Sequence, residues 1–247
     1  MARMSKSQID RLGARLKKGD LGEALLRELD DYRRSYHPAY DVVVRRIEAE
    51  LQLKPTGRPA KSTIAIVEKL TRESIRLTQV QDIAGCRITV ESPVEQDRTV
   101  TALTSMFEQV SIVDRRGHPS YGYRAVHAIV NLDGKLIEVQ VRTKLQHHWA
   151  EFSEKYSDVV DPDIKYGGGP KEVREILSSL SELIAEIEGA EIESAKMPDA
   201  TDVEYDKLPD SAKRAIADLR KSIYEQKQRI ARLMQKGVTD LSERNKQ

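Results

Sequence analysis

A two-residue turn, Asp133-Gly134, is the feature that most restricts the fold of this chain. Asp-Gly is a strong signal for a tight β-hairpin, and the flanking residues, 123–131 and 135–142, alternate in the manner of strands. A two-residue turn fixes the pairing of the strands, which places His127 opposite Gln140. The sequence therefore predicts an antiparallel hairpin whose register can be counted residue by residue.

This register divides the hairpin into two unlike faces. One face is apolar, and we expect it to pack into the core through Ile137, Val139 and Val141. The other face carries an imidazole, an acid, an amide and a guanidinium, from His127, Glu138, Gln140 and Arg142. A solvated strand face would alternate in the same way, so the pattern alone allows either a polar site or an exposed strand.

Charged residues beside a second, otherwise apolar strand favour the interpretation as a polar site. Asp82 stands at the entrance of a strand predicted over 83–91, and a bulge at Gly85 would be the alternative that brings Asp82 and Arg87 to one face. Two carboxylates on neighbouring strands, Asp82 and Glu138, suit Mg²⁺ bound together with phosphate oxygens. We expect Asp82→Asn to remove Mg²⁺-dependent turnover with little loss of stability, because it would relieve repulsion between the carboxylates.

Basic and aromatic residues supply what a nucleotide polyphosphate needs. Four cations could neutralise a phosphate chain: Arg58, Lys61, Lys69 and Arg87. Tyr123, an aromatic residue after a glycine, could stack on a base. The single cysteine, Cys86, lies in an apolar strand and is expected in the core rather than as a nucleophile.

Composition excludes several classes of protein. The chain has 247 residues, 39% hydrophobic and 33% charged, which is typical of a soluble globular protein. No apolar run reaches the roughly 18 residues of a membrane-spanning helix, and a lone cysteine fits a reducing cytoplasm. The net charge is only +1, but residues 1–80 carry 17 Lys and Arg against 11 Asp and Glu, an excess of +6. That excess is either ordinary helix surface or a mild attraction for phosphates.

The order of the predicted elements indicates an α+β fold. Apolar spacing predicts helices over 7–16, 20–53 with a break at Pro38, 63–75, 93–109, from 145 onward, 173–187 and 210–235. We expect a loop over 54–59, further strands at 83–91 and 110–115, and a polar connector over 198–209. Three regions follow: a helical N-terminal region 1–54, a core 55–166 and C-terminal helices 170–247. The C-terminal helices would dock on the core, pair with each other, or join a second copy in a homo-oligomer.

Four segments in this order resemble the synthetase domain of the RelA/SpoT proteins. They are Gly57-Arg-Pro-Ala-Lys61-Ser62 with Glu68-Lys69-Leu70, Asp82-Ile-Ala-Gly-Cys-Arg87, Gly122-Tyr-Arg-Ala-Val-His127 and Glu138-Val-Gln-Val-Arg-Thr143. The resemblance covers roughly residues 55–156 and implies a nucleotidyltransferase-like mixed sheet flanked by helices. It implies a GTP/GDP diphosphokinase, which transfers pyrophosphate from ATP to the 3′-hydroxyl of GDP or GTP and makes (p)ppGpp in stringent-response signalling.

The resemblance also assigns roles by position. Asp82 would hold Mg²⁺, and Glu138 would be the general base or share the metal. On the ATP side, Arg58 and Arg87 would sandwich the adenine, Lys61 and Lys69 would hold phosphates, and Gln140 would line the site. On the acceptor side, Tyr123 would stack on guanine, with His127, Arg115 and Arg116 nearby.

The chain departs from the family in two respects. It has no His-Asp dipeptide of the hydrolase domain, so we expect a small, synthetase-only member. The acceptor-side lysine is also absent, and Arg115, Arg116 or His118 stands in its place. This departure opens a second hypothesis, a toxin that pyrophosphorylates the 3′ CCA end of tRNA and has an antitoxin partner. A non-catalytic scaffold protein is a third.

Overall fold

The computed structural model describes residues 4–244, so the outer ends of the predicted regions 1–54 and 170–247 lie outside the described residues. Contacts between residues divide the chain into two compact units. The first comprises residues 1–88, 101–113 and 127–140, and the second comprises 89–100, 114–126 and 141–247. Each unit buries its own set of apolar side chains.

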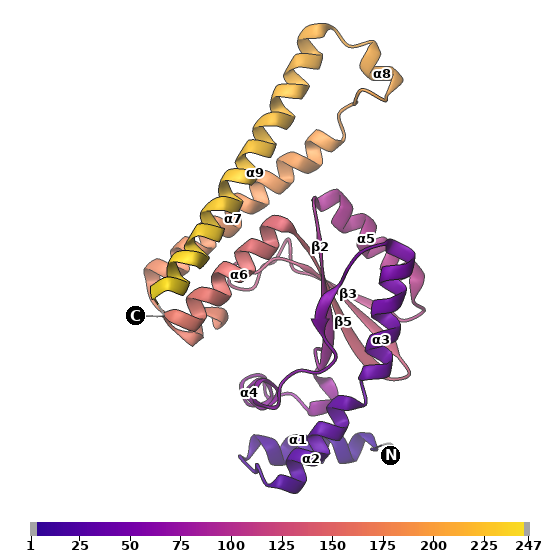
Figure 1. Cartoon of the computed structure of the whole chain (residues 1–247), viewed down its shortest axis with the longest axis vertical. Coiled ribbons are helices and arrows are strands. Elements are labelled where there is room, and N and C mark those ends of the chain that lie inside the picture. Colours follow the sequence, from indigo (N-terminus) through magenta and orange to yellow (C-terminus); the bar gives the residue numbers. More distant parts are fainter. Residues whose placement is uncertain (1–3, 245–247) are drawn as a thin grey trace. The chain divides into compact units, whose positions relative to one another are not determined.

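The first unit begins with three helices, α1 (Lys6–Lys17), α2 (Glu23–Arg34) and α3 (His37–Arg46), followed by a π-helical turn. The predicted break at Pro38 is confirmed, because Pro38 lies in the first turn of α3, where a missing N–H costs nothing. Helix α4 (Thr63–Glu73) begins at Ser62, whose hydroxyl accepts the backbone N–H of Ala65. Helices α1, α2 and α4 pack together, as Figure 1 shows at the N-terminal end.

A mixed five-stranded sheet, most of which belongs to the first unit, has the order β1-β2-β5-β4-β3. Its strands are β1 (Thr56–Arg58), β2 (Ala84–Val90), β3 (Val110–Asp114), β4 (Val126–Leu132) and β5 (Lys135–Thr143), and α5 (Pro93–Met106) follows β2. The sequence predicted a loop where β1 lies. That interpretation of the Pro and Gly content was wrong, because Gly57 allows β1 to approach β2 closely: a Cβ there would lie 2.5 Å from the Cα of Cys86.

The predicted hairpin is confirmed. Asp133 and Gly134 both have positive φ, 50° and 79°, as a tight two-residue turn requires, and β4 and β5 end and begin directly beside them. Along β5 the side chains of Ile137, Val139 and Val141 are fully buried, whereas Glu138 and Gln140 are only partly buried. Beside the hairpin turn, the Lys135 ammonium lies 4.4 Å from the ring centre of Tyr36, which ties the start of β5 to the N-cap of α3.

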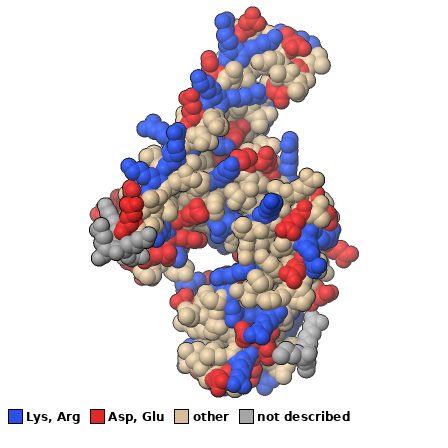
Figure 2. All heavy atoms as spheres, viewed as in Figure 1, with Lys and Arg blue, Asp and Glu red and all other residues tan. Residues whose placement is uncertain are grey.

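The second unit is mainly helical. Its helices are α6 (Lys144–Val159), α7 (Lys171–Ala195), α8 (Val203–Asp206) and α9 (Asp210–Arg244). Helices α7 and α9 run side by side, and both pack on α6 (Figure 1). The predicted connector contains α8, and α9 continues nine residues past the predicted end at 235. Figure 2 shows basic and acidic side chains interspersed over the long helices. No helix within residues 4–244 is long and apolar enough to cross a membrane.

Candidate functional site

The carboxylate of Asp82 lies between two ammonium groups. Its Oδ2 accepts from Nζ of Lys61 at 2.7 Å, and its Oδ1 accepts from Nζ of Lys69 at 2.9 Å. The three side chains are only 14–21% exposed, so water screens these attractions weakly. Burial alone would raise the pKa of Asp82, but the two lysines outweigh it and lower that pKa. Asp82 is therefore an ionised group in an attractive cluster. The predicted repulsion between Asp82 and Glu138 is present, but the two lysines dominate at Asp82, so we expect Asp82→Asn to cost stability rather than leave it almost unchanged.

Local structure places these lysines. Lys61 lies just before the N-cap of α4, and its backbone N–H donates to the carbonyl of Ile83 at 2.6 Å. The carbonyl of Lys61 accepts from Nε of Arg33 at 2.5 Å, which fixes this segment to α2. Lys69 projects from α4 two turns later. A helix and a strand entrance thus bring three residues distant in sequence to one point.

A second cluster lies on the polar face of the hairpin. Oε1 of Glu138 is 2.8 Å from Nδ1 of His127, and Oε2 accepts from Nε2 of Gln140 at 2.8 Å. Burial alone would raise the pKa of Glu138, as does the charge of Asp82, but the contacts with His127 and Gln140 outweigh both and lower it. The predicted sharing of one face by His127, Glu138 and Gln140 is confirmed, and the two carboxylates are electrostatically coupled.

Strands β1 and β2 place two guanidinium groups on one face. Arg58 is paired with Gly85, and Thr56 with Arg87, so both arginines point to the same side of the sheet as diagonal neighbours. Gly85 lies inside β2, where an added Cβ would meet the Glu138 carbonyl at 2.8 Å, so close approach to β5 accounts for this glycine. Cys86 faces the opposite side and is buried, which raises its thiol pKa to about 12 and confirms its core position.

The donor set can be tested for Mg²⁺. Within residues 4–244, no three His, Cys, Asp or Glu side chains gather as a metal-binding group. The two coupled carboxylates, Asp82 and Glu138, fit the usual mode in which Mg²⁺ takes one or two carboxylates and completes its shell with water and phosphate oxygens. The residues therefore fit a metal that arrives with a nucleotide rather than one held in an all-protein cage.

The predicted acceptor-side residues other than His127 lie in the second unit. The Tyr123 hydroxyl accepts from Arg142 at 2.9 Å, and the Arg142 guanidinium lies 4.9 Å from the centre of the Tyr123 ring. Arg115 donates to the Ser120 hydroxyl at 2.6 Å. Arg116 forms ion pairs with Asp97 and Asp114, both at 2.7 Å. Both arginines that replace the family lysine are thus held by partners in their own unit.

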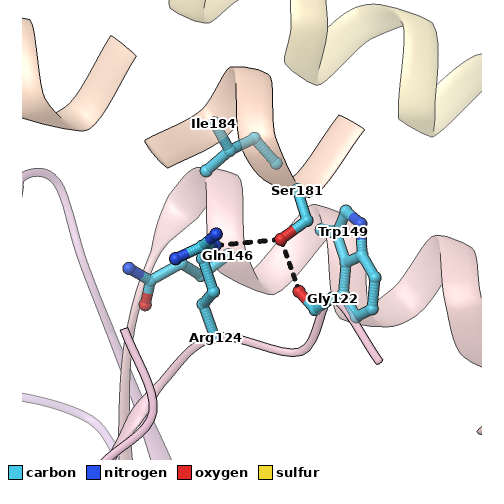
Figure 3. A pocket seen from close by; sticks show the side chains of 6 residues that line it. All are labelled: Gly122, Arg124, Gln146, Trp149, Ser181 and Ile184. Atoms are coloured by element: carbon cyan, nitrogen blue, oxygen red, sulfur yellow. Dashed lines mark hydrogen bonds between the residues drawn. The ribbon is translucent and has the colours of Figure 1, made fainter. Parts of the chain in front are cut away.

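Sequence reasoning missed the residues that hold the Tyr123 turn. Ser181 on α7 is 2% exposed; it donates to the Gly122 carbonyl at 2.7 Å and accepts from Nε of Arg124 at 2.9 Å (Figure 3). One signal could have found it: Ser181 and Glu188 occupy the apolar spacing 177, 181, 184, 188 of an amphipathic helix, where polar residues need buried partners.

Comparisons with known proteins agree with this arrangement. Residues 57–157 match the family model described as the region found in RelA / SpoT proteins. The uncharacterized protein Rv1366 of Mycobacterium tuberculosis is 35% identical over 150 residues, which cover 58% of this chain and 55% of the relative. The chain thus spans about half the length of this curated relative. The probable GTP diphosphokinase RSH3, chloroplastic, of Arabidopsis thaliana is 30% identical over 96 residues, which cover 37% of this chain and 14% of that protein.

A solved structure shows the same fold. The small alarmone synthetase 1 of Bacillus subtilis, bound to its product pppGpp, superposes with a TM-score of 0.53 at 23% identity, covering 70% of this chain and 96% of that one. The matched family region contains both carboxylates, all four predicted ATP-side cations and the Tyr123 turn. Residues 57–157 of this chain therefore match the region found in RelA/SpoT proteins, and they lie on an α+β fold that the solved alarmone synthetase shares.

Proposed function

We propose that this chain transfers pyrophosphate from ATP to the 3′-hydroxyl of a guanosine nucleotide, GDP or GTP. The observation that carries the proposal is the pair of clusters in the first unit: Asp82 between two lysines, and the partly buried, ionised Glu138, whose pKa the charge of Asp82 also affects. The RelA/SpoT family match and the partial similarity to a probable GTP diphosphokinase support the same reaction class.

On the ATP side, the phosphates need cations and the base needs flat partners. Lys61 and Lys69 would exchange Asp82 for phosphate oxygens when ATP binds, because both ammonium groups already converge on one point. Arg58 and Arg87 are diagonal neighbours, a relation that separates them by roughly 7–8 Å. That separation admits one aromatic ring between two guanidinium planes, as an adenine sandwich requires.

Glu138 is the group to accept the proton. Its lowered pKa keeps the carboxylate ionised at neutral pH, and His127 and Gln140 fix both oxygens. The acceptor 3′-oxygen forms a bond to the β-phosphorus of ATP, the bond between that phosphorus and the α,β-bridging oxygen breaks, AMP leaves, and the proton goes to Glu138. Most of the acceleration would come from positioning and charge neutralisation.

Asp82 and Glu138 are the residues that would hold Mg²⁺. When bound, the metal supplies charge neutralisation at the transferring phosphates. Asp82 would then exchange its lysine partners for the metal, while the lysines turn to the phosphates. The chain's own contribution is to keep two carboxylates and two ammonium groups within reach of one another.

A second acceptor, the 3′ end of tRNA, is favoured by one observation. Arg115 and Arg116, the residues in place of the family lysine, are both engaged inside the protein. The absence of that lysine would weaken the binding of a guanosine nucleotide that carries a 5′-phosphate chain. It would weaken less the binding of an acceptor whose 5′-phosphate continues into a polynucleotide. Such an acceptor would bind with a steep dependence on salt.

One transfer assay distinguishes these functions. The protein is incubated with Mg²⁺, ATP labelled in its transferable phosphates and, in parallel, GDP, GTP, adenine nucleotides or tRNA. Label in a guanosine 3′-pyrophosphate supports the proposal, and label only in tRNA supports the second function. Glu138→Gln should abolish either transfer, whereas Glu108→Gln, an exposed control, should not. Transfer to no acceptor would refute both and favour a non-catalytic scaffold.

A further inference from the structure

Helix α7, which lies outside the matched family region, holds the turn that presents Tyr123. The Ser181 hydroxyl bridges the residues on either side of Tyr123: it donates to the Gly122 carbonyl and accepts from Nε of Arg124. Arg124 in turn donates to the carbonyl of Arg116, so the loop over 116–124 is closed on itself at the same point. One buried hydroxyl therefore determines the path of the backbone before and after the tyrosine.

The turn itself tolerates little movement. Gly122 has φ +88°, and a Cβ there would lie 2.6 Å from the ring of Trp149. Trp149 is held by its indole N–H, which donates to the carbonyl of Leu177 on α7 at 2.8 Å. Helix α7 thus contacts the turn directly through Ser181 and indirectly through Trp149.

Helix α7 also fixes the strand end that supports Tyr123 from the other side. Oε2 of Glu188, two turns beyond Ser181, accepts from Gln146 at 2.8 Å, and Oε1 accepts from the hydroxyl of Thr143. Thr143 caps α6 and directly follows Arg142, whose guanidinium lies over the Tyr123 ring. One face of α7 therefore anchors both the turn and the end of the strand that carries Arg142.

The hollow between these elements is too narrow to be a ligand site. It leaves no room for a water molecule, and its lining consists of Gly122, Arg124, Gln146, Trp149, Ser181 and Ile184 (Figure 3). The contacts around Ser181 are therefore made for positioning rather than for binding.

We propose that Ser181 is a positioning residue for the acceptor: through Gly122 and Arg124 it sets the orientation of Tyr123 and hence the affinity for the acceptor base, with no part in binding ATP. This inference rests on the proposed function, because it assigns Tyr123 to the acceptor. It predicts that a change on α7 alters the KM for one substrate and leaves the other unchanged.

The test compares three variants of the full chain. Ser181→Ala removes both hydrogen bonds, Ser181→Thr retains the hydroxyl, and Ser179→Ala changes an exposed serine on the same helix. For Ser181→Ala we expect the KM for the acceptor to rise about tenfold, the effect of losing one or two hydrogen bonds, with the KM for ATP within about twofold. Ser181→Thr should restore most of the affinity, and Ser179→Ala should match the wild type. A general loss of fold would instead affect both substrates.

A second readout does not depend on catalysis. Trp149 is the only tryptophan in the chain and touches Gly122, so its fluorescence emission reports the turn directly. Ser181→Ala should shift this emission and Ser179→Ala should not. Unchanged emission, or an equal rise in KM for both substrates, would overturn the inference. A shifted emission in a protein that transfers to no acceptor would refute the proposed function while the anchoring by α7 stands.

Discussion

Nδ1 of His127 lies 2.8 Å from Oε1 of Glu138, so the imidazole donates a hydrogen bond to a carboxylate on the neighbouring strand. This contact opposes burial, which alone would raise the pKa of Glu138. The hairpin register creates the pair, because it brings side chains eleven residues apart onto one face.

Removing the imidazole should change the pH dependence of transfer. His127→Ala removes the hydrogen bond and the electrostatic attraction with which His127 lowers the pKa of Glu138. Burial and the charge of Asp82 remain, so the pKa of Glu138 should rise. The acidic limb of the kcat profile should therefore move to higher pH, because Glu138 must be ionised to accept a proton. His37→Ala, which changes an exposed histidine, should leave the profile in place. An unmoved acidic limb in His127→Ala would mean that Glu138 is not the titrating base.

Asp82→Asn should destabilise the protein as well as stop transfer. The substitution leaves Lys61 and Lys69, both about one-fifth exposed or less, with only Glu73, 3.9 Å from Nζ of Lys69, as a counter-charge. We expect the free energy of unfolding to fall by about 2 kcal/mol, as for lost hydrogen bonds to a charged group. Urea denaturation measures this, with the exposed Asp31→Asn as the control. A stability equal to that of the wild type would show that the lysines find other partners.

Arg33 should influence ATP binding without touching the nucleotide. Its guanidinium holds the carbonyl of Lys61, so Arg33→Gln should loosen Lys61 and raise the KM for ATP several-fold, about 1 kcal/mol of lost positioning. The neighbouring Arg34 has a side chain 70% exposed, and Arg34→Gln should leave both KM values unchanged. The idea fails if the KM for the acceptor rises as much as that for ATP.

Two glycines of the loop over 116–124 should differ in how much stability they lose when replaced by alanine. Gly122→Ala introduces a side chain at positive φ and against the ring of Trp149, which should cost about 2 kcal/mol of stability. Gly117 has no atom within 4 Å of an added Cβ, and Gly117→Ala should change stability by less than about 0.5 kcal/mol. Thermal denaturation of the two variants compares them directly, and similar melting temperatures would contradict the close contact with Trp149.

Glu188 should make stability fall as the pH rises. Burial raises its pKa, and the charge of Glu191 adds to this effect, although bonds from Thr143 and Gln146 and the charge of Lys227 oppose it. A carboxyl with a raised pKa in the folded state stabilises the fold below its unfolded pKa of about 4.5 and loses that contribution as pH rises through the folded value. Glu188→Gln should remove this loss, which urea denaturation across pH 4–8 would show. A variant that weakens with pH as the wild type does would exclude Glu188 as the cause.

Much of the first unit could be predicted from sequence because its signals are local. The Asp133-Gly134 turn gives the register, and the register places His127 beside Glu138. Asp82 was correctly expected at a strand entrance, but its lysine partners were assigned only to phosphates. Side chains 21 and 13 residues away leave no periodic trace of a mutual contact.

Two features, one in each unit, could not be predicted from the sequence. Ser181 contacts a turn 59 residues earlier, and no spacing rule connects the two positions. Strand β1 was missed for a different reason: the glycine that indicated a loop serves close pairing with β2. In both places long-range packing outweighs local preference.

The bond between Ser181 and Gly122 also imposes an order of events during synthesis. At 5–20 residues per second, Ser181 is added about 3 to 12 s after Gly122, whereas Lys61 and Asp82 are joined within a few seconds of each other. The nascent chain therefore has the parts of its ATP-side cluster well before it can lock the Tyr123 turn. Helix α7 is thus the last part of the Tyr123 turn's support to be synthesised.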